Sequence, residues 1–338
     1  MTRARDVADV QENLGGPVSP FVAGKNKILN GDFSIWQRGT TLSSGGYLAD
    51  RMLIGFAGGT QSRQTFTLGT APVAGYEGQF YLNVTLTANS QNFEHMQKIE
   101  NARTFAGQTI TMSFWARSTV GAQPLNVAIY QNFGTGGSPS SLTEATRISG
   151  SSPYTPTSSW QRYSFTFNVP SVSGKTFGTN NDSFLWIRFA QYTTTATNTS
   201  LDVWGLQVEA GSVATPFSTA TGNYPNELQA CKYYFERYTA AMPGQPSQID
   251  VANRPEWMLN YSEKRVAPTI TMNNPTGLTW VAITSASGAT NASFGGTFVG
   301  TATTQALLFF STASGISAYT FWVPDGGGSY SIDISAEL

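Results

Sequence analysis

Apolar and polar residues alternate along short runs through the first two thirds of the chain. The run from Tyr163 to Val169 is the clearest, because Phe165 and Phe167 alternate with Ser, Thr and Asn. A period of two places successive side chains on opposite faces of a strand, so this run predicts a strand with one buried and one solvated face. The same pattern predicts strands at residues 51–56, 64–68, 79–87, 93–99, 109–117, 125–133, 184–192 and 202–208.

Clusters of Gly, Ser, Pro and Asn separate these predicted strands. Many short strands with turn-forming residues between them are typical of a β-sandwich. The sequence therefore predicts an all-β fold in which residues 26–211 form a jelly roll.

The period of the apolar positions changes near residue 225. Apolar residues then recur at steps of three and four, which aligns them along one side of a helix, at Leu228, Cys231, Phe235 and Tyr238. Pro225 suits the first helical turn, where its missing N–H costs nothing. We therefore expect a short helix at 225–238 within a connector at 212–240.

Alternation returns after the connector and predicts a second, smaller β-sandwich at residues 241–338. Its expected strands are 269–272, 278–283, 295–299, 305–310, 317–323 and 330–334. The continuous apolar run from Ala306 to Phe310 predicts a strand that is covered on both faces. Either a second sheet or another subunit could supply that cover.

The composition supports a folded β protein and argues against several classes of partner. Charged residues make up 12% of the chain, against about 25% in usual globular proteins, and aromatic residues make up 13%. A formal net charge of −1 gives no excess of positive charge with which to bind nucleic acid. We expect no membrane insertion, because no segment is apolar for the ~18 residues that a spanning helix needs. A single cysteine, Cys231, allows no intrachain disulfide.

Three separated motifs resemble a module of tail-fibre and other virion fibre proteins of bacteriophages. They read Asn-Gly-Asp-Phe-x-x-Trp-Gln-Arg-Gly at 30–39, Trp-x-Leu-Gln-x-Glu-x-Gly-x-x-Ala-Thr-Pro-Phe at 204–217, and Glu-Leu-x-x-Cys-x-Tyr-Tyr at 227–234. The segment Arg265-Val266-Ala267-Pro268-Thr269 and the final Ala336-Glu337-Leu338 are also similar to such fibres. One departure is Met52, which stands after Ala49-Asp50-Arg51 where the family has tryptophan.

The resemblance implies a fold, an assembly and a function. It implies a sandwich like those of carbohydrate-binding modules, a homotrimer, and a location in the virion after assembly in host cytoplasm. Residues 1–25 would anchor the chain to other virion proteins, unless they are a frayed terminus without a role. The implied function is multivalent, non-catalytic attachment of a tail fibre to host-surface polysaccharide. The alternatives are a capsid fibre or decoration protein with a purely structural role, and a polysaccharide depolymerase, which we favour least.

Sugar binding uses aromatic faces against the pyranose ring, with amides and arginines on its hydroxyls. Six residues on the predicted strands offer this chemistry and could share a sheet face: Trp115, Arg117, Tyr130, Gln131, Arg188 and Tyr192. The competing interpretation is that they belong to the core, as most aromatic residues of a sandwich do.

A structural Ca²⁺ ion is a further expectation. Carbohydrate-binding sandwiches often hold Ca²⁺ between the segment entering the first strand and an acid on the last strand, through hard oxygen ligands. Asp32 and Asp202 occupy corresponding places in this sequence. A turn aspartate and a surface aspartate are the competing interpretation.

The sequence predicts no enzyme, no catalytic residue and no required cofactor. His95 is the only histidine, so any Ser-His-Asp arrangement would have to use it. It lies in an alternating run without a nucleophile-elbow motif, which favours a structural or solvent-facing histidine. The acidic residues are scattered and form no known hydrolase motif.

Overall fold

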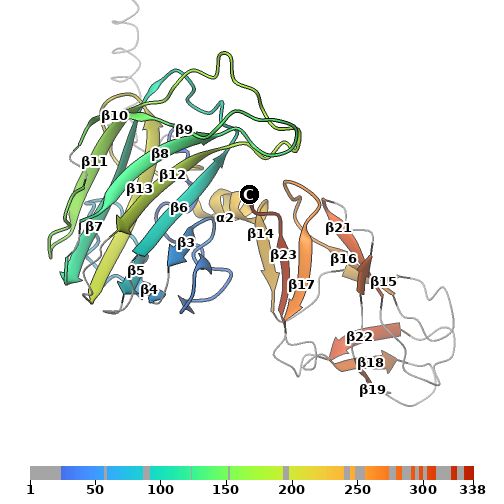
Figure 1. Cartoon of the computed structure of the whole chain (residues 1–338). Coiled ribbons are helices and arrows are strands. Elements are labelled where there is room, and N and C mark those ends of the chain that lie inside the picture. Colours follow the sequence, from blue (N-terminus) through green and yellow to red (C-terminus); the bar gives the residue numbers. More distant parts are fainter. Residues whose placement is uncertain are drawn as a thin grey trace, which may run out of the picture. The chain divides into compact units, whose positions relative to one another are not determined.

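We analysed a computed structural model of the chain (Figure 1). It describes residues 24–239 apart from 57–58, 87–91, 123, 151–152 and 193–197, and then 244–247, 256–273, 279–283, 291–293, 297–299, 303–309, 321–325 and 331–338. The expected anchoring segment therefore lies, up to residue 23, outside the described residues.

Two antiparallel sheets form the N-terminal domain. One has seven strands, in the order β1 (Thr41–Leu42), β4 (Thr60–Thr65), β5 (Phe80–Leu86), β13 (Thr199–Ala210), β7 (Thr109–Val120), β11 (Gln161–Asn168) and β10 (Thr146–Ser149). The other has six, in the order β2 (Gly46–Tyr47), β3 (Leu53–Phe56), β6 (Asn92–Glu100), β12 (Phe184–Tyr192), β8 (Asn126–Asn132) and β9 (Thr143–Glu144).

The two sheets pack face to face as a jelly-roll sandwich, which confirms the predicted fold class (Figure 1). Phe114 of β7 stacks on Phe189 of β12 across the core, with ring centroids 5.3 Å apart. Phe165 and Phe167 are buried, as the alternation of β11 predicts. Thr166, on the face expected to be solvated, is also buried, because its hydroxyl lies against the carbonyl of Ser212 in the connector.

The observed helix is shorter than the predicted one. α2 covers Tyr224–Lys232, and the following Phe235–Tyr238 is strand β14. The expectation of a helix to residue 238 is wrong, because β14 pairs with β23 (Ser331–Ser335), far along the chain. Local periodicity cannot show such a partner. The aromatic residues before β14 also favour strand over helix.

The contacts divide the chain between Glu227 and Leu228, and the C-terminal unit is again β. Its strands make three small antiparallel sheets. The first has β14, β23 and β17 (Thr269–Asn273); the second has β15 (Gly244–Ser247), β16 (Glu256–Asn260), β21 (Gln305–Phe309) and β20 (Thr297–Val299); the third has β19 (Asn291–Ser293), β18 (Thr279–Ile283) and β22 (Phe321–Asp325). The side chains from Ala306 to Phe310 lie outside the described residues, so their expected double cover stays a prediction.

A buried charge cluster stabilises this unit. The ammonium group of Lys264 is fully buried and donates to Glu236 at 3.0 Å and to the carbonyl of Lys232 at 2.6 Å. Burial alone would raise the pKa of Glu236, but the ammonium groups of Lys232 and Lys264, together with a hydrogen bond from Tyr238, lower it to about 2. The carboxylate is therefore ionised and paired inside the fold.

Candidate functional site

Buried hydrogen bonds of the first motif join separate segments of the chain. Asn30 is fully buried in a left-handed conformation, with φ at +58°, and its amide nitrogen donates to the carbonyls of Ile35 and Asp50. Its backbone N–H donates to Glu227 of the third motif at 2.7 Å. Gly31 accepts a bond from the Leu206 N–H at 2.8 Å, so the first motif also joins the second.

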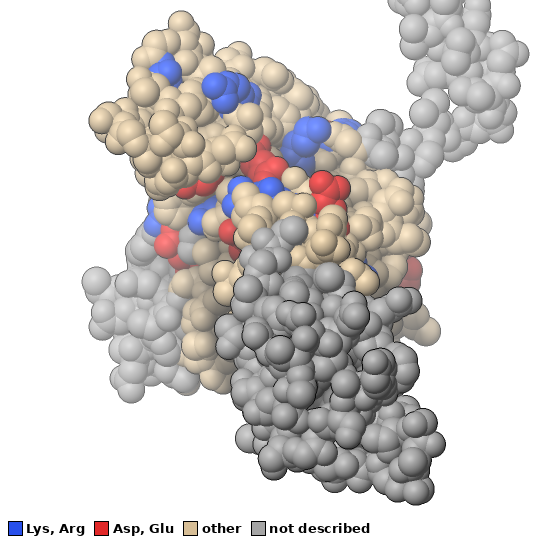
Figure 2. Space-filling model, turned by 90° about the vertical axis from the view of Figure 1, so that its right-hand side faces the viewer, with Lys and Arg blue, Asp and Glu red and all other residues tan. Residues whose placement is uncertain are grey.

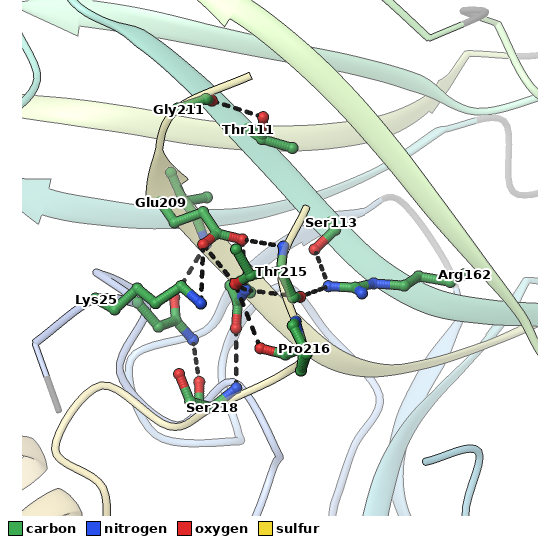
Figure 3. A network of polar contacts seen from close by, with 12 residues as sticks. Lys25, Thr111, Ser113, Arg162, Glu209, Gly211, Thr215, Pro216 and Ser218 are labelled. Carbon is green, nitrogen blue, oxygen red and sulfur yellow. Dashed lines mark hydrogen bonds and ion pairs between the residues drawn. The ribbon is translucent and has the colours of Figure 1, made fainter. Parts of the chain in front are cut away.

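The second motif holds the connector against the outer face of the seven-stranded sheet (Figure 3). Glu209 accepts bonds from the backbone N–H and hydroxyl of Thr215, at 2.8 and 2.7 Å, and pairs with Lys25 at 3.4 Å. Arg162 donates to the carbonyl of Thr215 from the other side. These residues of the second motif therefore stabilise the fold.

Tryptophan rings lie beneath this connector. Trp204 is fully buried, 5.0 Å from the ring of Phe217 and 5.5 Å from that of Trp115. Met52, where the family has tryptophan, is also fully buried and belongs to the same core. Methionine therefore fills that position in this chain.

The six candidate sugar-binding residues do not share one face. Trp115 and Arg117 lie on β7 in the seven-stranded sheet, whereas the others lie on β8 and β12 in the six-stranded sheet. Gln131 is fully buried and donates to the carbonyls of Ala102 and Pro170, both at 3.1 Å. The expectation of one shared face is wrong, because strands that alternate alike can belong to either sheet.

Both candidates on β7 have protein partners. The ring of Trp115 is buried, with the guanidinium of Arg162 4.6 Å from its centroid. Arg117 pairs with Asp202 at 2.7 Å and bonds the Tyr81 hydroxyl at 3.2 Å. Their side chains therefore stabilise the outer layer of the seven-stranded sheet.

Tyr130 and Arg188 do lie together, on the outer face of the six-stranded sheet. They line a hollow of about 290 Å³, which we call the outer groove, together with Asn126, Val127, Ala128, Glu144, Arg147 and Ala190. The small side chains of Ala128 and Ala190, on adjacent strands, leave room for it. Tyr192 ends β12, and its side chain lies outside the described residues.

Aromatic and charged groups lie in and beside the outer groove: Tyr130 and Arg188 line it, and Trp186 and Glu94 are their neighbours outside the lining. Tyr130 faces Trp186 across the β8 and β12 pairing, with ring centroids 5.6 Å apart. The Arg188 guanidinium lies 5.9 Å from the Tyr130 ring and 5.5 Å from the Trp186 ring, and it forms an ion pair with Glu94 of β6. Rings beside a paired Arg and carboxylate suit a sugar, which has an apolar C–H face and hydroxyls that both donate and accept.

Sequence reasoning missed Trp186, Glu94 and Glu144 as neighbours of Tyr130 and Arg188. The sequence could have indicated Trp186, because it lies two positions before Arg188 on the same strand and therefore points to the same face of the sheet. Glu94 and Glu144 depend on cross-strand register, which places Glu94 opposite Ala190 and Glu144 opposite Tyr130. Neither residue could be placed beside Tyr130 or Arg188 without knowing which strands pair and in which register.

The two expected Ca²⁺ ligands have different protein partners. Asp32 accepts a bond from the Tyr76 hydroxyl at 2.7 Å, whereas Asp202 is bonded to Arg117 and to the amide of Asn83. Among the described residues there is no group of three or more His, Cys, Asp or Glu side chains able to hold a metal. A Ca²⁺ site at Asp32 and Asp202 stays a prediction.

His95 lies in the core between Phe33 and Phe189, with ring centroids 6.1 and 4.5 Å away. Within the described part of the chain, neither ring nitrogen has a hydrogen-bond partner. Burial lowers its pKa to about 3. A neutral imidazole enclosed by rings has no contact with solvent, so His95 packs in the core as a structural residue.

The described surface carries few charges. Figure 2 shows one face on which most residues are uncharged and on which acidic and basic side chains lie next to one another. None of the described helices has the length and hydropathy that a membrane crossing requires.

No protein-family model matches this chain, and neither does any curated protein. Among solved structures, the chain is similar to the xylan-binding domain CBM22-1 of Paenibacillus barcinonensis Xyn10C, at 13% identity and a TM-score of 0.29, over 57% of this chain and 98% of that one. It is similar to the enzymatically active domain of tailspike protein 4 of bacteriophage CBA120, at 11% identity and a TM-score of 0.35, over 59% of this chain and 23% of that one. The tripod from the baseplate of bacteriophage Tuc2009 is similar at 11% identity and a TM-score of 0.28, over 71% of this chain and 85% of that one. Similarities this low do not determine what the present chain binds.

Proposed function

We propose that this chain is a component of a phage virion fibre that binds host-surface glycans without catalysis, through the outer groove. The observation that supports this function is the combination of Tyr130 and Trp186 with the paired Arg188 and Glu94 beside a hollow of about 290 Å³. The fibre assignment is supported by the three motifs that resemble phage fibre proteins.

The proposed mechanism is weak binding multiplied by copy number. One sugar ring would stack on Tyr130 or Trp186, and its hydroxyls would bond Arg188, Glu144 and Asn126. A trimer anchored through residues 1–25 would present three grooves, and linked binding events raise the overall affinity by about 10²–10⁴ without new contacts.

The test is glycan binding by the purified full chain, on an array of bacterial surface polysaccharides followed by calorimetry. Trp186→Ala is expected to weaken binding at least about tenfold, because it removes a stacking face. Ala128→Leu is expected to do the same by filling the groove. Trp160→Ala is the matched control, since Trp160 is also half-buried but packs on Phe66 and Tyr81 at the other sheet.

Three outcomes would contradict the proposal. An equal loss of glycan binding in Trp160→Ala and Trp186→Ala would show that the loss comes from reduced stability of the fold and not from a change in the groove. Binding only to virion proteins would support a capsid fibre or decoration protein. Release of reducing ends from a bound polysaccharide would instead support a depolymerase.

A further inference from the structure

A second hollow lies among loops of the N-terminal unit, beside the first turn of α2. We call it the connector pocket; its volume is about 390 Å³, and none of its lining residues lines the outer groove. The turn after Asn30 contributes Asp32 and Ser34, and the connector and α2 contribute Asn223, Tyr224 and Glu227. Three chain segments far apart in sequence, including the loop at Tyr76, therefore enclose one polar space.

Hydrogen bonds from the protein hold the carboxylates of Asp32 and Glu227 in place, and Asp32 can still accept hydrogen bonds from a ligand. The two oxygens of Asp32 accept one bond each, from the Tyr76 hydroxyl at 2.7 Å and from the Ser34 N–H at 3.3 Å. Glu227 accepts bonds from the Asn30 N–H at 2.7 Å and from the Thr221 N–H and hydroxyl. Since each carboxylate oxygen has two acceptor sites, Asp32 can accept two further bonds from a ligand.

Donors and an aromatic ring line the same space. In the part of the chain that the structure describes, the Ser34 hydroxyl, the Asn223 amide nitrogen and the Tyr224 hydroxyl donate no hydrogen bond to protein. Asn223 uses only its oxygen, which accepts the Asn226 N–H at 3.0 Å. Tyr224 is 54% exposed, so its ring is accessible to a ligand.

We propose that the connector pocket binds a single neutral pyranose, with the ring of Tyr224 against its C–H face and Asp32, Ser34 and Asn223 bonded to its hydroxyls. The pocket is of the size that small-molecule sites have, and it offers donors, acceptors and a ring together, as a sugar requires. This site is additional to the outer groove and does not depend on it.

A cation is the competing ligand, because two acids and no Lys or Arg line the pocket. The neutral sugar fits better, because each carboxylate already accepts bonds from protein N–H and O–H groups and the pocket also offers hydrogen-bond donors, which a cation cannot use.

The test is saturation-transfer NMR on the full chain carrying both Trp186→Ala and Ala128→Leu, which together remove a ring beside the outer groove and fill the groove itself. The probes are the methyl glycosides of glucose, galactose, mannose and N-acetylglucosamine. At least one is expected to bind with a dissociation constant on the order of 1 mM, as a ligand of that size allows. Adding Tyr224→Ala is expected to weaken binding at least tenfold, whereas Tyr224→Phe keeps the ring and most of the affinity.

Asn223→Asp is the sharper variant, because it keeps an oxygen that accepts the Asn226 N–H and replaces the amide donor by a carboxylate oxygen, which only accepts and adds a negative charge. It is expected to weaken binding several-fold without changing the unfolding temperature. Absence of binding by all four glycosides would overturn the proposal, and so would binding that persists in Tyr224→Ala. Displacement of a bound glycoside by methylammonium or by Ca²⁺ would identify a cation site instead. None of these results bears on glycan binding by the unsubstituted groove.

Discussion

The single histidine should make the N-terminal unit lose stability in mild acid. His95 is fully buried between two phenylalanine rings, and among the described residues neither of its nitrogens has a hydrogen-bond partner. Burial disfavours the imidazolium and lowers the pKa of His95 from 6.5 to about 3. Between pH 6.5 and pH 3, the unfolded chain is therefore protonated at His95 and the folded chain is not.

The sign and size follow from this difference. Because only the unfolded state is protonated between pH 6.5 and 3, the free energy of unfolding is greatest above pH 6.5 and falls as the pH decreases. At pH 5 the unfolded pKa lies 1.5 units above the solution pH, and at 1.36 kcal/mol per unit the loss is about 2 kcal/mol. The folded pKa of about 3 lies well below pH 5, so the loss at pH 5 depends on the unfolded value alone.

The assay is urea unfolding of the full chain at pH 7 and pH 5, compared with His95→Leu and His95→Gln. Neither variant titrates at this position, so each should lose about 2 kcal/mol less than the natural chain between the two pH values. Carboxylates contribute equally to all three proteins and cancel in the difference. Equal losses in the natural chain and both variants would refute the reasoning, as would a His95 ring proton whose NMR shift titrates near pH 6.5.

Three further predictions concern buried residues. Lys264→Met should destabilise the C-terminal unit by about 3–5 kcal/mol in thermal unfolding, because Glu236 stays buried without that ammonium group; adding Glu236→Leu should restore much of the loss. Gly31→Ala should destabilise the N-terminal unit by more than about 1 kcal/mol in urea, because a Cβ atom there would overlap a backbone carbonyl of β13; unchanged stability would contradict the described packing. Glu209→Gln should cost about 1–3 kcal/mol and speed hydrogen exchange at the Thr215 amide, whereas protection equal to the natural chain would show that the carboxylate does not hold the connector.

Alternation predicted most strands because it reflects burial on one face, which is local information. The strand from Phe184 to Tyr192 has the predicted bounds. The strand expected at 64–68 instead covers Thr60–Thr65, where pairing with β1 and β5 sets its position. The helix prediction failed at β14 for the same reason, since a distant partner strand determines that segment.

The candidate site was only partly predictable. The chemistry of Tyr130 and Arg188 was visible in the sequence, and the structure places both at one groove. The sequence could not show which sheet holds a strand, so Trp115 and Arg117 were grouped with residues of the other sheet. It also could not show that Gln131, next to Tyr130, points into the core, because parity assigns neighbours to opposite faces without saying which face is buried.

The motifs and the outer groove use different residues, and this separation limits what the resemblance predicts. Asn30, Glu209 and Glu227 are buried, and the Asn30–Glu227 bond and the Lys25–Glu209 ion pair join segments far apart in the chain. Such bonds specify a scaffold, because losing one partner leaves a buried polar group unsatisfied. The groove residues come from β8, β9, β10 and β12, outside all three motifs. A chain with the same motifs could therefore keep this fold and carry different groove residues, so the resemblance supports the fold, whereas the groove residues decide what the outer groove binds.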